Sequence, residues 1–363
     1  MAKHQVFLVH GMGDFQHDWS LGIQKLMRDA YAQYAVTGTM GWDADFQFVE
    51  LNYNDIFEEI RQQWRENAEA ASQALIGSGL ASASAKQLVN LANGATGDDF
   101  FRTHVLDVVL YRFFKPVAER VQQAVRKQIL ERLNAFPQND TPPWSILAHS
   151  LGTSVTNDTL HAMFTQVVDG QLLGDRFKPD FVFMVANVSR VLWSKGGNFF
   201  ASAVRPHTLE TRGMCFKYCS YNHPLDPFPR VQRFNPPPAD WFPPGGDPKS
   251  LYEFFEMKQD DIQDINVHGL SHYLSHPSVH ASIFRTLWSS PQLIGDAEIA
   301  TAYKAWRKDT LTAAKRTQAI KLLKDYAVTG SADWTQIVDS IMRFRTDVLE
   351  KGGSTEDGEI VHA

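Results

Sequence analysis

Residues 142–158 read PPWSILAHSLGTSVTND, and this stretch decides the fold. The two prolines at its start are unfavourable inside a helix or a central strand, so a new element begins after them. The apolar run from Trp144 to Leu147 is typical of a short buried strand. After the turn, apolar residues recur at helical spacing, at Val155, Leu160 and Met163. The stretch therefore predicts a strand, a tight turn and a helix.

The turn holds a serine between two small residues. Ala148 lies two positions before Ser150 and Gly152 two positions after it, which lets the backbone bend sharply without collisions. A serine in that place is strained and presents its hydroxyl at the carboxyl edge of the sheet, beside the positive end of a helix dipole. The alternative is a plain strand-to-helix turn with a capping serine. Because both flanking elements are predicted, we favour Ser150 as a nucleophile.

Further apolar stretches are typical of strands, and they alternate with helical patterns. These stretches cover residues 5–9, 46–53, 180–188 and 214–221. The alternation predicts an α/β fold with a mostly parallel sheet covered by helices on both faces. Sites in such sheets gather at the carboxyl ends of strands. His10, Ser150 and Asp226 each follow a predicted strand end, so we expect them at one edge of the sheet.

A serine hydroxyl attacks only when a base takes its proton, and an acid orients that base. Asp226 lies in NHPLDPFP (222–229), where prolines on both sides stiffen the chain. We predict Asp226 as the acid; the alternative is an ordinary turn-forming aspartate. His268 precedes a glycine where the chain leaves an ordered segment. We predict His268 as the base, with His272 in reserve.

Two further histidines, His276 and His280, continue the four-residue spacing of the candidate bases. Side chains four apart share one face of a helix, an arrangement that would suit a metal ion. Pro277 argues against one continuous helix, since the residue before a proline disfavours helical angles. We therefore assign His276 and His280 to capping, packing or the surface, and we predict neither a metal nor another cofactor.

Negative charge that develops on a substrate oxygen during the reaction is stabilised by hydrogen-bond donors that are fixed in position beforehand. Two main-chain N–H groups are candidates for this oxyanion hole. Leu151 follows the serine at the start of the helix, and Met12 lies in the glycine-containing turn HGMG (10–13). Each donor of this kind is worth roughly 3–4 kcal/mol of barrier.

Taken together, these motifs resemble the α/β-hydrolase superfamily, and within it the lipase and esterase branch. They are VFLVHGMG (6–13), AHSLG (148–152), NHPLDPFP (222–229) and NVHGLSHYL (266–274). The resemblance covers most of residues 5–290 and departs from the commonest Gly-x-Ser-x-Gly pattern only at Ala148, which is still small. It implies a serine hydrolase that cleaves carboxylic esters through an acyl-enzyme. The residues implied are Ser150 as nucleophile, Asp226 as acid, His268 as base, and Met12 and Leu151 as oxyanion donors.

The chain divides into a core and two additions. Residues 1–290 are the predicted core, and about 55–115 within it form a helical insert. That insert either covers the serine as a lid or packs as ordinary helices. Residues 291–350 are a predicted helical extension, suited to capping the domain or to a homo-oligomer contact, and 351–363 have the composition of a disordered tail.

The substrate is the least determined part of the prediction. The insert is weakly apolar, and Trp241 and Phe242 are expected at the tip of a Pro/Gly-rich loop (234–250). We therefore expect a small-molecule ester or lipid-like substrate with a hydrophobic acyl group. Two alternatives stay open: a non-catalytic or regulatory interaction protein of this fold, and the same triad used as a thioesterase, amidase or acyltransferase.

Overall charge and composition exclude several classes of partner. The chain has 41 acidic and 35 basic residues and a formal net charge of −6, with no basic stripe, so no nucleic-acid partner is expected. No apolar window approaches the ~20 residues of a transmembrane helix. The absence of a signal segment favours the cytoplasm. Cys215 and Cys219 would lie too far apart in a strand to form a disulfide.

Overall fold

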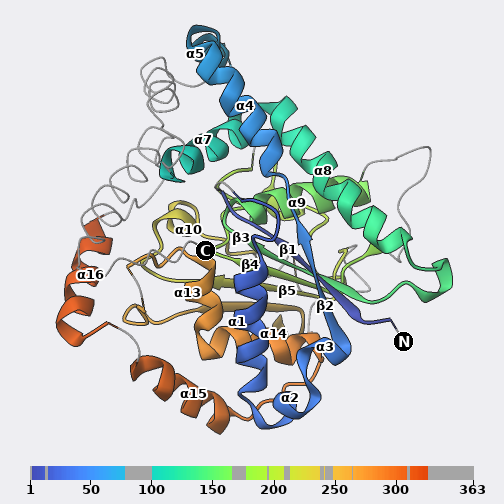
Figure 1. Cartoon of the computed structure of the whole chain (residues 1–363), viewed down its shortest axis with the longest axis vertical. Coiled ribbons are helices and arrows are strands. Elements are labelled where there is room, and N and C mark those ends of the chain that lie inside the picture. Colours follow the sequence, from blue (N-terminus) through green and yellow to red (C-terminus); the bar gives the residue numbers. More distant parts are fainter. Residues whose placement is uncertain are drawn as a thin grey trace.

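The computed structural model of the chain is an α/β fold built on a six-stranded sheet (Figure 1). The strands lie in the order β2-β1-β3-β4-β5-β6, and every neighbouring pair is parallel. Their bounds are β1 His4–Val9, β2 Phe46–Leu51, β3 Trp144–His149, β4 Phe181–Val185, β5 Lys217–Asn222 and β6 Tyr252–Glu256. The predicted parallel sheet is confirmed, and it has one more strand than the sequence indicated.

The structure describes most of the chain, and all structural statements here concern that part. The described residues are 2–12, 15–77, 100–165, 177–193, 196–207, 213–237, 241, 248–263, 265–308 and 311–325. Within them, no helix combines the length and the apolar character that crossing a bilayer requires.

Helices cover both faces of the sheet (Figure 1). One face is covered by α8 (Lys115–Asn134) and α9 (Leu151–Thr165), the other by α1 (Leu21–Ala32), α13 (Leu270–Ser275) and α14 (Pro277–Leu287). The shorter elements are α2 Ala35–Met40, α3 Trp42–Asp45, α10 Pro227–Val231, α12 Pro248–Leu251 and the 3-10 helices η1 Gln138–Asp140 and η3 Phe199–Ala201. This arrangement confirms the predicted covering of both faces.

Alternate residues of β3 explain why its sequence is apolar throughout. Ile146 and Ala148 belong to the core cluster on the α8–α9 side, whereas Leu147 belongs to the cluster on the α1–α14 side. A central parallel strand is buried on both faces and therefore shows no polar alternation. The edge strand β6 differs, because its residues are only half-buried or exposed.

Trp241 does not lie at an exposed loop tip, so that expectation is wrong. Its side chain is 1% exposed and belongs to the main core cluster. Its ring lies 5.1 Å from Tyr218 and 5.5 Å from Phe234, and its indole Nε1 donates to the carbonyl oxygen of Phe200 at 3.3 Å. The indole fills the core instead of forming an acyl-binding surface. Phe242 lies outside the described residues.

The predicted insert is helical where the structure describes it. Its described helices are α4 (Asn54–Glu66), α5 (Ala68–Gly77) and α7 (Phe100–Phe113), and α8 begins at Lys115, one residue before Pro116. Apolar side chains of α4 and α7, such as Phe57 and Val109, share the main core cluster with Val121 of α8. The described helices of the insert are thus packed like ordinary core helices. Its action as a lid stays a prediction, because residues 78–99 lie outside the described residues.

Two buried polar contacts attach α7 to its neighbours. Arg61 of α4 and Asp107 of α7 form an ion pair with side-chain exposures of 3% and 1%. Tyr111 of α7 donates a hydrogen bond to Asp158 Oδ2 of α9 at 2.9 Å. When one member of a buried pair is removed, the other charge stays buried and has neither its partner nor water, which is unfavourable. These contacts therefore hold the insert in place.

We expect Asp107→Ala to lower the free energy of unfolding by about 3 kcal/mol, because the buried Arg61 guanidinium would lose its buried carboxylate and keep, among the described residues, only the half-exposed Glu58, 2.9 Å away, as an ionic partner. Urea denaturation of both proteins measures the difference. Asp43→Ala is the matched control: the ion pair of Asp43 with Arg28 is exposed, so its loss should cost about 1 kcal/mol or less. Equal losses in the two variants would contradict a structural role for the buried pair.

The C-terminal extension is helical where it is described. It contains α15 (Asp296–Lys308) and α16 (Ala313–Asp325), while residues 326–363 lie outside the described residues. Arg307 of α15 contacts Asp261 Oδ1 at 3.0 Å. Leu323 of α16 is fully buried in a small cluster with Leu225 and Val267. The extension therefore packs against the loops that follow β5 and β6.

Candidate active site

The order of the strands determines where a site can form. The chain runs from β1 to β2 on one side, and β3 then lies on the other side of β1. Loops that leave such a switch point open a crevice at the carboxyl ends of the two strands. The turn after β1 and the turn after β3 are neighbours there, because a Cβ placed on Gly11 would lie 3.0 Å from Ser150 Cβ.

Ser150 lies on a strained turn between β3 and α9. Its φ angle is 51°, in the left-handed region that L-residues other than glycine rarely adopt. The backbone is fixed there by hydrogen bonds from Ser150 N to Val185 O (3.0 Å) and from Thr153 N to Ser150 O (2.9 Å). A Cβ at Gly152 would come within 2.2 Å of the carbonyl oxygen of His10. The predicted backbone strain and the need for a small residue after the serine are both confirmed.

Three of the predicted site residues meet in one hydrogen-bonded chain. His268 Nε2 lies 2.7 Å from Ser150 Oγ, and His268 Nδ1 lies 2.8 Å from Asp226 Oδ2. An ionised carboxylate only accepts hydrogen bonds, so Nδ1 carries a proton and Nε2 is left to accept the serine proton. These three residues come from the loops after β3, β5 and β6, separated by 76 and 42 positions in the chain.

Asp226 serves two structural purposes at once. It caps α10, where its Oδ1 accepts from Phe228 N at 3.1 Å, so the turn-forming reading of this aspartate also holds. Its Oδ2 accepts from His268 and from the hydroxyl of Tyr273, at 2.8 Å each. The carboxylate is fully buried, and these donors replace the water it has lost.

His268 is held through its backbone as well as its ring. The imidazole of His149 hydrogen-bonds the carbonyl oxygen of His268 at 2.7 Å, and the ring of Phe228 lies 4.2 Å from the His268 ring. Sequence reasoning did not single out His149, although it is the residue next to the serine. Ser150 is 1% exposed and His268 9%, so both side chains are buried in the structure.

The other histidines of the cluster have different environments. The ring of His272 lies against His223 and Tyr273, 5.5 and 6.0 Å away, and not between the serine and the aspartate. His276 caps α14 by accepting from Ser278 N, and α13 ends at Ser275, so the break at Pro277 is confirmed.

His280 is a packing residue, in agreement with its assignment. Its Nε2 lies 2.6 Å from the hydroxyl of Tyr34, and its Nδ1 lies 2.9 Å from Leu274 O. Burial lowers the pKa of His280 to about 4, so the ring is neutral near pH 7. Among the described residues, no group of three or more His, Cys, Asp or Glu side chains is arranged to hold a metal ion.

The two expected oxyanion donors lie in the turns that flank the serine. Leu151 is the first residue of α9, where N–H groups have no carbonyl partner within the helix. Met12 follows Gly11, and this turn is supported by the Tyr53 hydroxyl, which donates to His10 O at 2.6 Å. Burial lowers the pKa of His10 to about 4, so its ring packs there as a neutral group. The oxyanion role of both N–H groups stays a prediction.

A second set of neighbouring serine, histidine and aspartate side chains shows that residue types alone do not identify a nucleophilic serine. Ser145 Oγ lies 2.8 Å from His4 Nε2, and His4 Nδ1 lies 4.0 Å from Asp180 Oδ2. These residues lie at the amino ends of β1, β3 and β4, and Ser145 has ordinary strand geometry. No turn presents the hydroxyl of Ser145 to a ligand, so Ser150 remains the candidate nucleophile.

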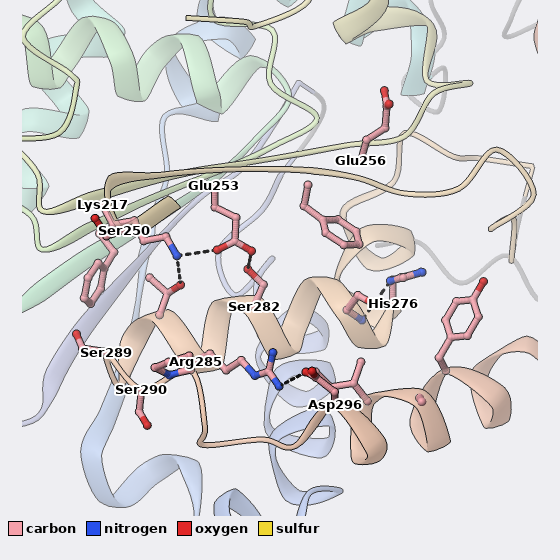
Figure 2. Close-up of a pocket in the computed structure, with 18 of the residues that line it drawn as sticks. Lys217, Ser250, Glu253, Glu256, His276, Ser282, Arg285, Ser289, Ser290 and Asp296 are labelled. Atoms are coloured by element: carbon pink, nitrogen blue, oxygen red, sulfur yellow. Dashed lines mark hydrogen bonds and ion pairs between the residues drawn. The ribbon is translucent and has the colours of Figure 1, made fainter. Parts of the chain in front are cut away.

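A cavity of about 1010 Å³ lies elsewhere, between β6, α14 and α15 (Figure 2). Four of its charged side chains form two ion pairs: Lys217 Nζ lies 2.6 Å from Glu253 Oε2, and Arg285 Nη2 lies 2.7 Å from Asp296 Oδ1. None of the three residues of the hydrogen-bonded chain lines it. The cavity is thus separate from the candidate active site.

Comparison with known proteins adds little. No family model matches this chain, and no curated protein does. The crystal structure of an uncharacterized protein from Pseudomonas aeruginosa aligns with 98% of this chain and 55% of that chain, with 11% sequence identity and a TM-score of 0.30. The chain therefore spans about half the length of that protein, and a likeness of this degree supports no conclusion about fold or function.

Proposed function

We propose that this chain is a serine hydrolase of the α/β-hydrolase type that cleaves carboxylic esters. One observation carries the proposal: a serine on a strained turn shares a hydrogen-bonded chain with a histidine and a buried aspartate. A backbone strained at a single polar residue is costly, and such strain is typical of functional sites. The position at the switch point of the sheet adds independent support, because ligands of open α/β sheets bind there.

The proposed reaction is acyl transfer in two steps. His268 Nε2 takes the proton of Ser150 as Oγ attacks the ester carbonyl carbon, and a tetrahedral oxyanion forms. The N–H groups of Met12 and Leu151 stabilise this oxyanion. His268 then gives the proton to the departing alcohol, which leaves an acyl-enzyme at Ser150. Water attacks the acyl carbon with His268 again as base, and the acid is released.

The proposed substrate class rests on the sequence. The weakly apolar composition of the insert favours an ester with a hydrophobic acyl group, while the described apolar side chains of the insert, such as Phe57 and Leu110, lie in the main core cluster. Because Trp241 is part of the core, that residue no longer supports this substrate class.

A fluorophosphonate probe tests the proposal directly. We expect the native protein to be labelled at Ser150, because only an activated serine hydroxyl attacks the phosphorus of such a probe. Mass spectrometry of the digested protein locates the modification. Ser145, which is also hydrogen-bonded to a histidine, is the internal control and should stay unmodified. A folded protein without label at Ser150 would refute the hydrolase and favour a non-catalytic protein of this fold. Parallel assays with esters, thioesters and amides identify the leaving group.

A further inference from the structure

We propose that Tyr273 is a positioning residue of this site, whose hydroxyl holds the carboxylate of Asp226 against His268. The inference rests on the proposed function, since positioning matters only if His268 acts as a base. Tyr273 does not touch Ser150, so it acts through Asp226. Sequence motifs give it no role, because its partner lies 47 positions earlier in the chain.

The direction of the contact is fixed by a third residue. The hydroxyl of Tyr273 lies 2.8 Å from Asp226 Oδ2, and the backbone N–H of His223 donates to the same hydroxyl oxygen at 2.9 Å. A tyrosine hydroxyl has one proton, and an ionised carboxylate can only accept. The His223 N–H occupies a lone pair of the hydroxyl, so the proton of Tyr273 points at Asp226.

The same tyrosine joins the two loops that carry the acid and the base. Tyr273 lies on α13, which begins two residues after His268, whereas His223 lies three residues before Asp226. The two loops are therefore joined at two places, by the carboxylate–imidazole pair and by the tyrosine bridge. The ring of Tyr273 is fully buried in the cluster formed with α1 and α14, which gives the hydroxyl a rigid support.

Burial and the neighbouring carboxylate keep the hydroxyl protonated. Burial first, and then the charge of Asp226, raise the pKa of Tyr273 well above its ordinary value. The hydroxyl of Tyr273 is thus a hydrogen-bond donor at neutral pH. It shares the negative charge of Oδ2 with the His268 Nδ1–H group, which donates to the same oxygen.

Tyr273→Phe removes the donor and keeps the ring. We expect kcat for ester hydrolysis to fall about 10- to 100-fold, the range for one hydrogen bond to a charged group, with KM little changed. Without Tyr273, more of the carboxylate charge acts on the imidazolium form of the base. The acid limb of the pH–rate profile should therefore move to higher pH, a change that a loss of packing alone would not produce.

Tyr221→Phe is the matched control. Tyr221 of β5 is also fully buried and packs in the same core cluster as Tyr273, but its hydroxyl is hydrogen-bonded to Ser282 Oγ of α14, at 2.8 Å, and not to Asp226. Removing the hydroxyl of Tyr221 should leave kcat and the acid limb of the pH–rate profile unchanged. A second test variant carries 4-aminophenylalanine at position 273, which restores an N–H donor and should recover part of the lost kcat.

A measurement without turnover separates this inference from the proposed function. The proton between His268 Nδ1 and Asp226 should give a low-field NMR resonance that is absent from His268→Ala, and Tyr273→Phe should shift it. If the wild-type protein does not react with a fluorophosphonate, the function fails while this resonance still reports on Tyr273. An unshifted resonance, or a fall in kcat with an unmoved acid limb and no recovery with 4-aminophenylalanine, would overturn the positioning role.

Discussion

Replacing His268 with alanine should lower kcat for ester hydrolysis by about 10⁶-fold, the effect of removing the base from a serine triad. His268 Nε2 is the acceptor that the Ser150 hydroxyl contacts, at 2.7 Å, and the serine is not nucleophilic until its proton is taken. Steady-state kinetics with an activated ester measures the change. Circular dichroism checks that the variant is folded.

His272→Ala is the comparison that decides between the two candidate bases. The His272 ring packs against His223 and Tyr273, so its loss should lower stability and change kcat little beside the loss in His268→Ala. The reverse pattern, with activity kept in His268→Ala and lost in His272→Ala, would assign the base to residue 272.

Asp226→Asn should lower kcat by about 10⁴-fold while the fold is retained, as expected when a triad carboxylate becomes an amide. Asparagine has one accepting oxygen, whereas Asp226 accepts from Phe228 N at Oδ1 and from Tyr273 at Oδ2. In either orientation the amide NH₂ replaces one accepting atom. Where it faces His268, Nδ1 must accept, and Nε2 then carries the proton and cannot take one from the serine.

Asp261→Asn is the matched control for this variant. Asp261 is equally buried, and its Oδ2 lies 3.2 Å from His276 Nε2, but that pair contacts neither Ser150 nor Asp226 by any hydrogen bond of the described residues. Its replacement should lower the melting temperature and leave kcat close to that of the wild type. If both variants lost activity equally below their melting temperatures, the loss would reflect buried charge in general and not the role of Asp226.

Local chemistry explains what the sequence could predict. The turn around Ser150 is specified within five residues, since the strained backbone needs a small neighbour on each side. Asp226 and His268 were predictable because each follows an ordered segment in a loop marked by proline or glycine. The parallel sheet was predictable for a similar reason: β1, β3 and β4 each contain an apolar run typical of a buried strand.

Contacts between distant residues explain what the sequence could not predict. His149 bonds the backbone of a residue 119 positions later, and no local pattern indicates such a contact. The strand β6 has the sequence YEFFE and lies at the edge of the sheet, so it shows neither a long apolar run nor strict alternation. Trp241 stands in a Pro/Gly-rich segment that indicates exposure, yet its indole completes the core.

The small cluster around Leu323 affects when, during translation, the loops that carry Asp226 and His268 gain their support. Leu225 and Val267 each stand directly before a member of the hydrogen-bonded chain, and helix α16 packs on both. Ribosomes release the amino-terminal part of a chain first. A nascent chain that has exposed only its sheet lacks helix α16, which packs behind both loops, so we expect the arrangement around Ser150 to become stable only after residues near 325 have emerged.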